Sequence, residues 1–167
     1  MFLSLFTRKQ TPIQTFRTYL PQVVYGAVDG TVTTFAVVAG ATGGDLSSKI
    51  IIILWLANLF ADGVSMSISA YLSARSEKLG KKTPISIALW TLVAFVVIGF
   101  IPMIPYVFGL GTFQLSCIMT GLAFLSIGIL KWYLSHTSLF SSGLQTLGLG
   151  TIAALIAYGV WAWLGAL

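Results

Sequence analysis

Long apolar segments alternate with short polar connections along the whole chain. Five segments, residues 23–43, 50–74, 85–108, 113–134 and 144–166, are apolar throughout most of their length. Each is long enough to cross a bilayer, since a spanning helix takes about 20 mostly apolar residues. The pattern therefore predicts an all-α integral membrane protein with five transmembrane helices per chain, all in one domain over residues 23–167.

Residues 1–22 precede the first apolar segment and are predicted to form a cytoplasmic tail. Ile13, Phe16 and Leu20 recur at helical spacing beside basic residues, which is typical of a helix that lies on an anionic membrane surface. A tail without a defined structure fits equally well. The opening MFLSLFTRKQ lacks leading positive charges, and its apolar run is too short for a signal peptide.

The basic residues predict the orientation in the membrane. They gather in the tail, in the connection ARSEKLGKKTP and at Lys131, all on one side of a five-helix arrangement, while only Lys49 falls on the other side. Lysine and arginine mark the cytoplasmic face, so the N-terminus is predicted inside and the C-terminus outside. This topology explains the net charge of +5 without a nucleic-acid partner. With 57% hydrophobic and 8% charged residues, a soluble domain is excluded.

Two of the predicted helices carry polar stripes. In the first, Tyr25, Asp29 and Thr33 recur every four residues and share one helix face. In the second, polar residues recur at steps of three and four toward the cytoplasmic end: Asn58, Asp62, Ser65, Ser69, Ser73 and Ser76. Carboxylates inside a membrane are costly and mark functional sites, so the two aspartates are the first candidates.

Asp29 and Met66 are predicted to lie at similar depths in the membrane. With a rise of about 1.5 Å per residue, Asp29 lies roughly 10 Å and Met66 about 12 Å from the cytoplasmic face. Asp62 lies one turn further in, near the midplane. A carboxylate beside a thioether favours a transition metal such as Fe²⁺, Mn²⁺, Co²⁺ or Zn²⁺ over Mg²⁺. These three residues form the predicted metal site.

One chain offers few ligands for a dehydrated dication, whereas a two-fold homodimer would double them. Small residues four apart let membrane helices approach closely. The glycines Gly26, Gly30 and Gly40 are therefore predicted to pack at the dimer axis. The polar residues around the metal site, with one acidic residue at the cytoplasmic mouth, are predicted to line the transport path: Tyr25, Thr33, Asn58, Ser65, Ser69 and Glu77.

Purely structural roles stay open at these positions. Asp29 could bond to a helix terminus or a threonine, Met66 could fill space in the core, and the serines could hold helices together. The sequence shows no nucleophile–base pair, Walker loop or Cys-x-x-Cys motif, and His136 has no partner at metal-ligand spacing. An enzyme is therefore not expected.

Several stretches resemble one known family. YGAVDGTVTTFAVVAGATGG, residues 25–44, resembles the first helix of the vacuolar iron transporter family. ADGVSMSISAYLSARSE, residues 61–77, resembles its second helix, with the Ser-Met pair and the Tyr-Leu-x-x-[Lys/Arg]-Ser-Glu ending. PMIPYVF and SIGILKWYLSHTSLFSSGLQTLGLG are similar to later parts of the family pattern, in the same order.

The resemblance implies a five-helix dimer that moves Fe²⁺ or Mn²⁺ out of the cytosol, into a vacuole or across the cell envelope, with proton exchange in the better-understood members. It places the family's first-helix aspartate on Asp29 and its second-helix methionine on Met66. The metal is then cargo, and no cofactor is bound permanently. Burial favours the protonated form of a carboxylate, so a proton and a metal could compete for Asp29 in an antiporter.

The chain departs from the family pattern in three places. Asn58 replaces a common glutamate, while Asp62 stands where a small residue is usual. In the fifth helix, Ser-Gly-Leu-Glu becomes Ser-Gly-Leu-Gln with Gln145. The glutamate-rich cytoplasmic domain between helices two and three is reduced to SEKLGKKTP. The chain thus resembles a short form that lacks the cytoplasmic metal-binding domain.

The sequence predicts a transporter for a divalent transition metal, with Fe²⁺ or Mn²⁺ as first choice, in a bacterial inner membrane or, in a eukaryote, a vacuolar membrane. Two other functions stay open. A small efflux transporter for organic cations would line its site with aromatic residues, and Tyr25 is the only one on the stripe side of the first segment. A non-catalytic membrane scaffold would use the stripes as helix contacts.

Overall fold

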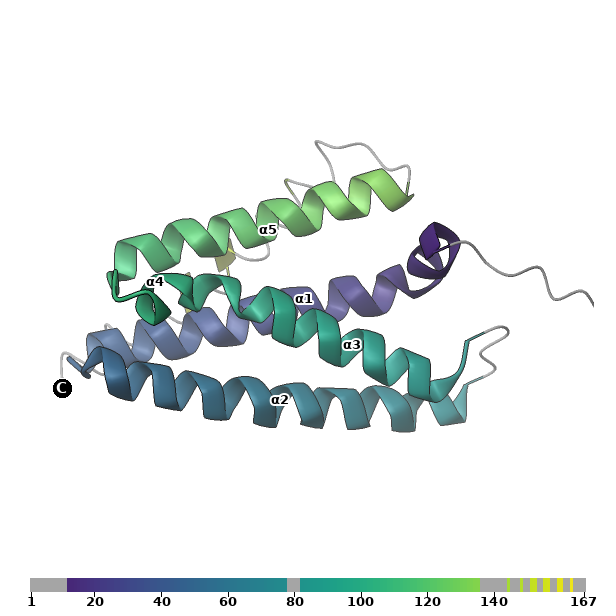
Figure 1. Ribbon diagram of the computed structural model, residues 1–167, viewed down its shortest axis with the longest axis horizontal. Helices are drawn as coiled ribbons and strands as arrows, with labels where there is room; N and C mark the ends of the chain where they lie inside the picture. The colour runs from purple at the N-terminus through teal and green to yellow at the C-terminus, as the bar shows by residue number, and fades with distance from the viewer. Residues whose placement is uncertain are drawn as a thin grey trace, which may run out of the picture.

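The fold is a bundle of long helices whose connections alternate between two ends (Figure 1). The computed structural model describes residues 12–77 and 82–135, and beyond them the helical residues 144, 148, 151, 152, 155, 156, 159, 160 and 163. Its elements are α1 (Pro12–Gly43), α2 (Ser48–Ser76), α3 (Pro84–Gly99), η1 (Ile101–Met103), α4 (Ile104–Val107) and α5 (Phe113–Ser135). The part of the chain that the structure describes is all-helical.

Four stretches are long and apolar enough to cross a membrane: Ile13–Gly43, Ser48–Ser76, Pro84–Val107 and Phe113–Leu134. They correspond to the first four predicted segments. Most of the fifth, residues 144–166, lies outside the described residues, as do residues 1–11 of the tail, the connection 78–81 and His136. The fifth span and the orientation therefore stay predictions.

Helix α1 is longer than the first predicted segment. It begins at Pro12 rather than at residue 23 and contains Pro21. Pro12 fits the first turn of α1, because the N–H group that proline lacks would have no helical partner there. The early turns pack on α3, where the rings of Phe16 and Tyr19 lie 5.3 and 5.9 Å from that of Trp90. Residues 12–22, assigned from sequence to the tail, are thus the first turns of α1.

The third predicted segment, residues 85–108, is not one continuous helix. Helix α3 ends at Gly99, and η1 and α4 follow it. Pro102 and Pro105 explain the interruption, because each lacks the N–H that would continue the helical hydrogen bonds. At this break the backbone carbonyl of Pro102 accepts a hydrogen bond of 2.8 Å from the Ser116 hydroxyl of α5. This bond ties the break to the neighbouring helix.

Helices α1 and α3 pack backbone against backbone. A Cβ atom on Gly26 would collide with the carbonyl oxygen of Thr91, and one on Gly30 with the carbonyl oxygen of Phe95. A Cβ atom on Gly99 would lie 2.8 Å from the carbonyl oxygen of Gly30. Only glycine allows this approach, which is closer than ordinary helix packing.

The glycines predicted to pack at a dimer axis therefore divide into two groups. Gly26 and Gly30 are buried against α3 of the same chain, so the spacing of small residues reflects a contact within the protomer. Gly40 is exposed, and a Cβ atom there would meet nothing within 4 Å. Of the three, Gly40 alone stays available to a second chain.

The described helices show the burial pattern of a membrane bundle. Exposed apolar side chains recur every four residues on the outer faces of α2 and α3: Phe60, Val64, Ile68 and Leu72, and Ile85, Leu89, Val93 and Val97. The buried polar residues are hydroxyl side chains, and each is hydrogen-bonded: Thr31, Thr34, Thr91, Ser116 and Thr120. The bundle thus faces its surroundings with hydrocarbon and satisfies its polar groups internally.

The α1–α3 contact gives a stability prediction. Gly30→Ala is expected to lower the free energy of unfolding by about 1–3 kcal/mol, because the added methyl group forces two backbones apart. The matched control is Gly121→Ala in α5, where a Cβ atom meets nothing within 4 Å. Unfolding in detergent measures both, and equal stability of the two variants would contradict the close approach.

Candidate transmembrane metal site

Asp29 lies on a face of α1 that the other described helices leave open. Tyr25 is 61% exposed, Asp29 is exposed, and Thr33 is half-buried, so the predicted stripe forms one surface. The Thr33 hydroxyl donates a hydrogen bond of 2.9 Å to the backbone carbonyl of Asp29. Because this bond uses the backbone, the carboxylate oxygens stay unused.

Asp62 of α2 lies close enough to Asp29 for the two carboxylates to interact electrostatically. Neither carboxylate has a hydrogen bond or an ion pair with any other described residue. Two like charges repel each other, and a cation between them relieves the repulsion. The two carboxylates therefore form a negatively charged region inside an apolar bundle, where a charge without a counter-charge is unfavourable.

Met66 follows Asp62 by one helical turn and lies on the same face of α2. Its side chain is half-buried and packs against the hydrophobic cluster that contains Trp55, Leu59 and Phe95. The structure thus places Asp29 within electrostatic range of Asp62, and Met66 follows next along the α2 face. This packing suits a core residue, so the role of Met66 as a ligand stays a prediction.

The other predicted path residues differ in their surroundings. Asn58 is half-buried and makes no hydrogen bond to any described residue. Ser65 and Ser69 are exposed. Ser67, which the stripe omitted, is the serine that joins two helices, since its hydroxyl donates to the carbonyl of Ala88 at 3.1 Å. No sequence pattern indicates this bond, because it depends on how α2 lies on α3.

The coordination shell is incomplete within one protomer. Among the described residues, no three His, Cys, Asp or Glu side chains gather closely enough to hold a metal ion. Two carboxylates and a thioether leave coordination positions that water or a second chain has to fill. Such a site suits an ion that enters and leaves more than one that is bound permanently.

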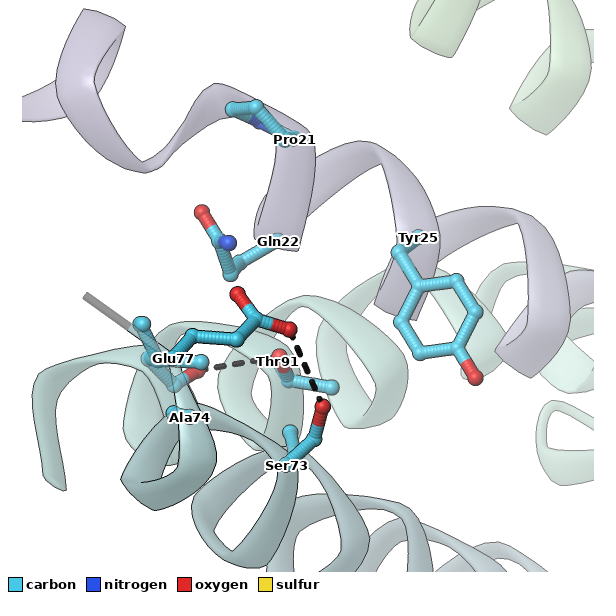
Figure 2. A pocket seen from close by; sticks show the side chains of 9 residues that line it. Pro21, Gln22, Tyr25, Ser73, Ala74, Glu77 and Thr91 are labelled. Atoms are coloured by element: carbon cyan, nitrogen blue, oxygen red, sulfur yellow. Dashed lines mark hydrogen bonds between the residues drawn. The ribbon is translucent and has the colours of Figure 1, made fainter. Parts of the chain in front are cut away.

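A cavity of about 310 Å³ lies between the start of α1, the end of α2 and the first turns of α3 (Figure 2). We call it the mouth cavity; its polar lining comes from Gln22, Tyr25, Ser73 and Glu77. It lies at the end of the bundle that holds Arg17, which is cytoplasmic in the predicted orientation. Tyr25 connects it with Asp29, one turn deeper on α1. Sequence patterns did not point to Gln22, because a single amide side chain outside the polar stripes is not distinctive.

Comparison with known proteins identifies the family. The sequence profile of the VIT family matches residues 20–82 and 77–162. The chain belongs to the VIT family. Its two matched stretches meet in the short connection between α2 and α3. Membership confirms the resemblance read from the helix motifs and the prediction that the chain is not an enzyme.

Individual relatives are named vacuolar iron transporters. The protein from Toxoplasma gondii is 44% identical over 70 residues, which are 42% of this chain and 23% of that protein. Vacuolar iron transporter 1 of Eucalyptus grandis is 24% identical over 207 aligned residues, covering 83% of each chain. An alignment of 207 positions is longer than this chain of 167 residues, so it contains a long insertion in the relative.

The carboxylate pair gives a binding prediction. Asp62→Asn is expected to weaken divalent-metal binding about tenfold, which corresponds to about 1.4 kcal/mol, because it removes one of two charges that face the ion. Asp45→Asn is the matched control, since Asp45 lies in the connection between α1 and α2, away from the pair. Titration of the purified protein with Mn²⁺ measures both. Equal affinities would show that Asp62 takes no part in the site.

Proposed function

We propose that this VIT family member is a membrane transporter for a divalent transition metal, with Fe²⁺ or Mn²⁺ as cargo. The carrying observation is the Asp29–Asp62 pair, two carboxylates in an apolar bundle without a protein partner among the described residues. A structural aspartate would be expected to have such a partner, because an unpaired charge in apolar surroundings is destabilising. The names of the relatives favour iron.

The metal path runs along the facing stripes of α1 and α2. Asp29 and Asp62 supply charge, and Met66 supplies a soft ligand that favours a transition metal over Mg²⁺. Tyr25, Thr33 and Asn58 offer oxygen atoms along the same path. The family resemblance favours transport out of the cytosol, with entry at the Glu77 end of the path, which lies at the predicted cytoplasmic end of the bundle.

A homodimer completes the site. None of the described helices covers the stripe around Asp29, and an ionisable side chain does not tolerate contact with lipid well. A second chain packed on this face, near the exposed Gly40, would cover the stripe and double the ligands. This contact differs from the glycine contact of Gly26 and Gly30, which α3 already occupies.

Proton exchange fits the same carboxylates. A metal can bind only the deprotonated form, so its arrival displaces a proton and its departure allows one to return. This competition at Asp29 or Asp62 would couple the two fluxes in opposite directions. A transport rate that is indifferent to an imposed pH gradient would contradict this part of the proposal.

The decisive experiment is metal flux into proteoliposomes. Wild type is expected to transport Fe²⁺ and Mn²⁺, and Asp29→Ala to lower the rate at least tenfold, because the path loses a charge. Asp45→Asn, the matched control, is expected to retain the wild-type rate. Co²⁺ and Zn²⁺ serve as further cargo.

Two results would favour the rival functions. No flux of any of these metals through folded wild type would contradict the transport proposal and favour a scaffold. Flux of a bulky organic cation without any metal flux would favour the efflux transporter. Unfolding in detergent shows in each case that the variant is folded.

A further inference from the structure

Helices α3 and α5 form an open wedge over α1. Both pack on α1 but hardly touch each other, and they diverge from the η1–α4 end toward the end where α1 begins (Figure 1). A cavity of about 340 Å³ lies in this wedge, lined by residues of all three long helices. We call it the wedge groove; Val23 and Ala27, both buried, line it from α1. It lies in the half of the bundle that is cytoplasmic in the predicted orientation.

The lining of the wedge groove is apolar. Its side chains are aliphatic or aromatic apart from Ser126, and the Ser126 hydroxyl already donates a hydrogen bond of 2.7 Å to the backbone carbonyl of Ala123. Such a lining offers no ligand to an ion and does not compensate a polar group for lost hydration. An empty apolar cavity would also forfeit packing contacts. The occupant that suits the groove is therefore hydrocarbon.

The rim of the wedge groove is open to the surroundings of the bundle. Val93 and Val97 of α3 are 51% and 57% exposed, and Ser126 on the opposite wall is exposed as well. Ala27 and Asp29 lie about 200° apart around α1, because each residue turns a helix by about 100°. A second chain that covers Asp29 would therefore leave the groove facing the lipid of the membrane.

Basic residues lie at the cytoplasmic end of the wedge groove. Arg17 follows Phe16, which lines the groove from α1, and Lys131 follows Leu130, which lines it from α5. Arg17 is exposed, and none of the described acidic residues pairs with it. Because side chains tilt toward the N-terminus of their helix, Arg17 extends toward the membrane surface. A molecule in the groove would meet apolar side chains along its length and positive charge at its end.

We infer that the wedge groove binds an acyl chain of an anionic phospholipid from the cytoplasmic leaflet, with the lipid phosphate near Arg17 and Lys131. Basic residues beside a gap between helices on the cytoplasmic side suit an anionic headgroup. The acyl chain fills the space that α3 and α5 leave over α1 and so completes the packing of the bundle. This inference is independent of metal transport, because the groove lies on the side of α1 away from Asp29.

The test measures phospholipid retained by the full chain in native mass spectrometry, after delipidation in detergent and titration with dioleoyl phosphatidylglycerol or dioleoyl phosphatidylcholine. Wild type is expected to bind the anionic phosphatidylglycerol about fivefold more tightly than phosphatidylcholine. Val97→Trp, which fills the groove from its exposed rim, should lower the affinity for both lipids about tenfold, because the acyl chain loses its space. Val64→Trp is the matched control, since Val64 is an exposed valine of α2, away from the groove.

The headgroup is tested separately. Arg17→Gln removes a positive charge and leaves the groove intact, so it should lower the affinity for phosphatidylglycerol to that for phosphatidylcholine. Arg75→Gln is the matched control, because Arg75 lies at the same end of the bundle but on α2. This variant should keep the preference of wild type.

Ser126→Phe fills the groove from the opposite wall and replaces Val97→Trp if that variant does not fold in detergent. Phospholipid binding that neither variant lowers would overturn the groove as the lipid site. Equal affinity of wild type for the two phospholipids would overturn the assignment to an anionic lipid. A groove-filling variant that dissociates a dimer but keeps its phospholipid would show that a second copy of the chain occupies the groove, and would overturn the inference.

Discussion

The close approach of α1 and α3 is the constraint on which the rest of the structure depends. Gly26 and Gly30 bring the α1 backbone against the carbonyl groups of Thr91 and Phe95, and no other residue type would fit. With one face of α1 held in this way, the neighbouring face with Asp29 is left open. Helix α2 also packs on α3, so α3 contacts both of the helices that carry Asp29 and Asp62.

The second feature is a pair of carboxylates that no basic side chain among the described residues neutralises. The bundle satisfies its buried hydroxyl groups internally, yet Asp29 and Asp62 have no hydrogen-bond partner or basic partner among the described residues. In an apolar surrounding such groups are unfavourable unless something supplies the missing positive charge. A transient metal ion or a proton meets this need.

Much of this could be predicted from the sequence, and the limits have a physical reason. Hydropathy located the four described spans, and helical periodicity singled out Asp29 and Asp62, which lie within electrostatic range of each other. Periodicity identifies the face of a helix but not its neighbour, which is why Gly26 and Gly30 were assigned to a dimer axis. Hydropathy does not show where the backbone hydrogen bonds of a helix are interrupted, so it did not reveal the helix break at Pro102.

The central claim, that a transition metal binds between the facing stripes with Met66 as a ligand, is tested most directly by X-ray absorption on Co²⁺ bound to the protein. The proposed site predicts a sulfur neighbour in the wild-type spectrum, and its loss in Met66→Leu with the oxygen neighbours retained. A shell of oxygen atoms alone, identical in wild type and Met66→Leu, would contradict the claim and leave Met66 as a packing residue.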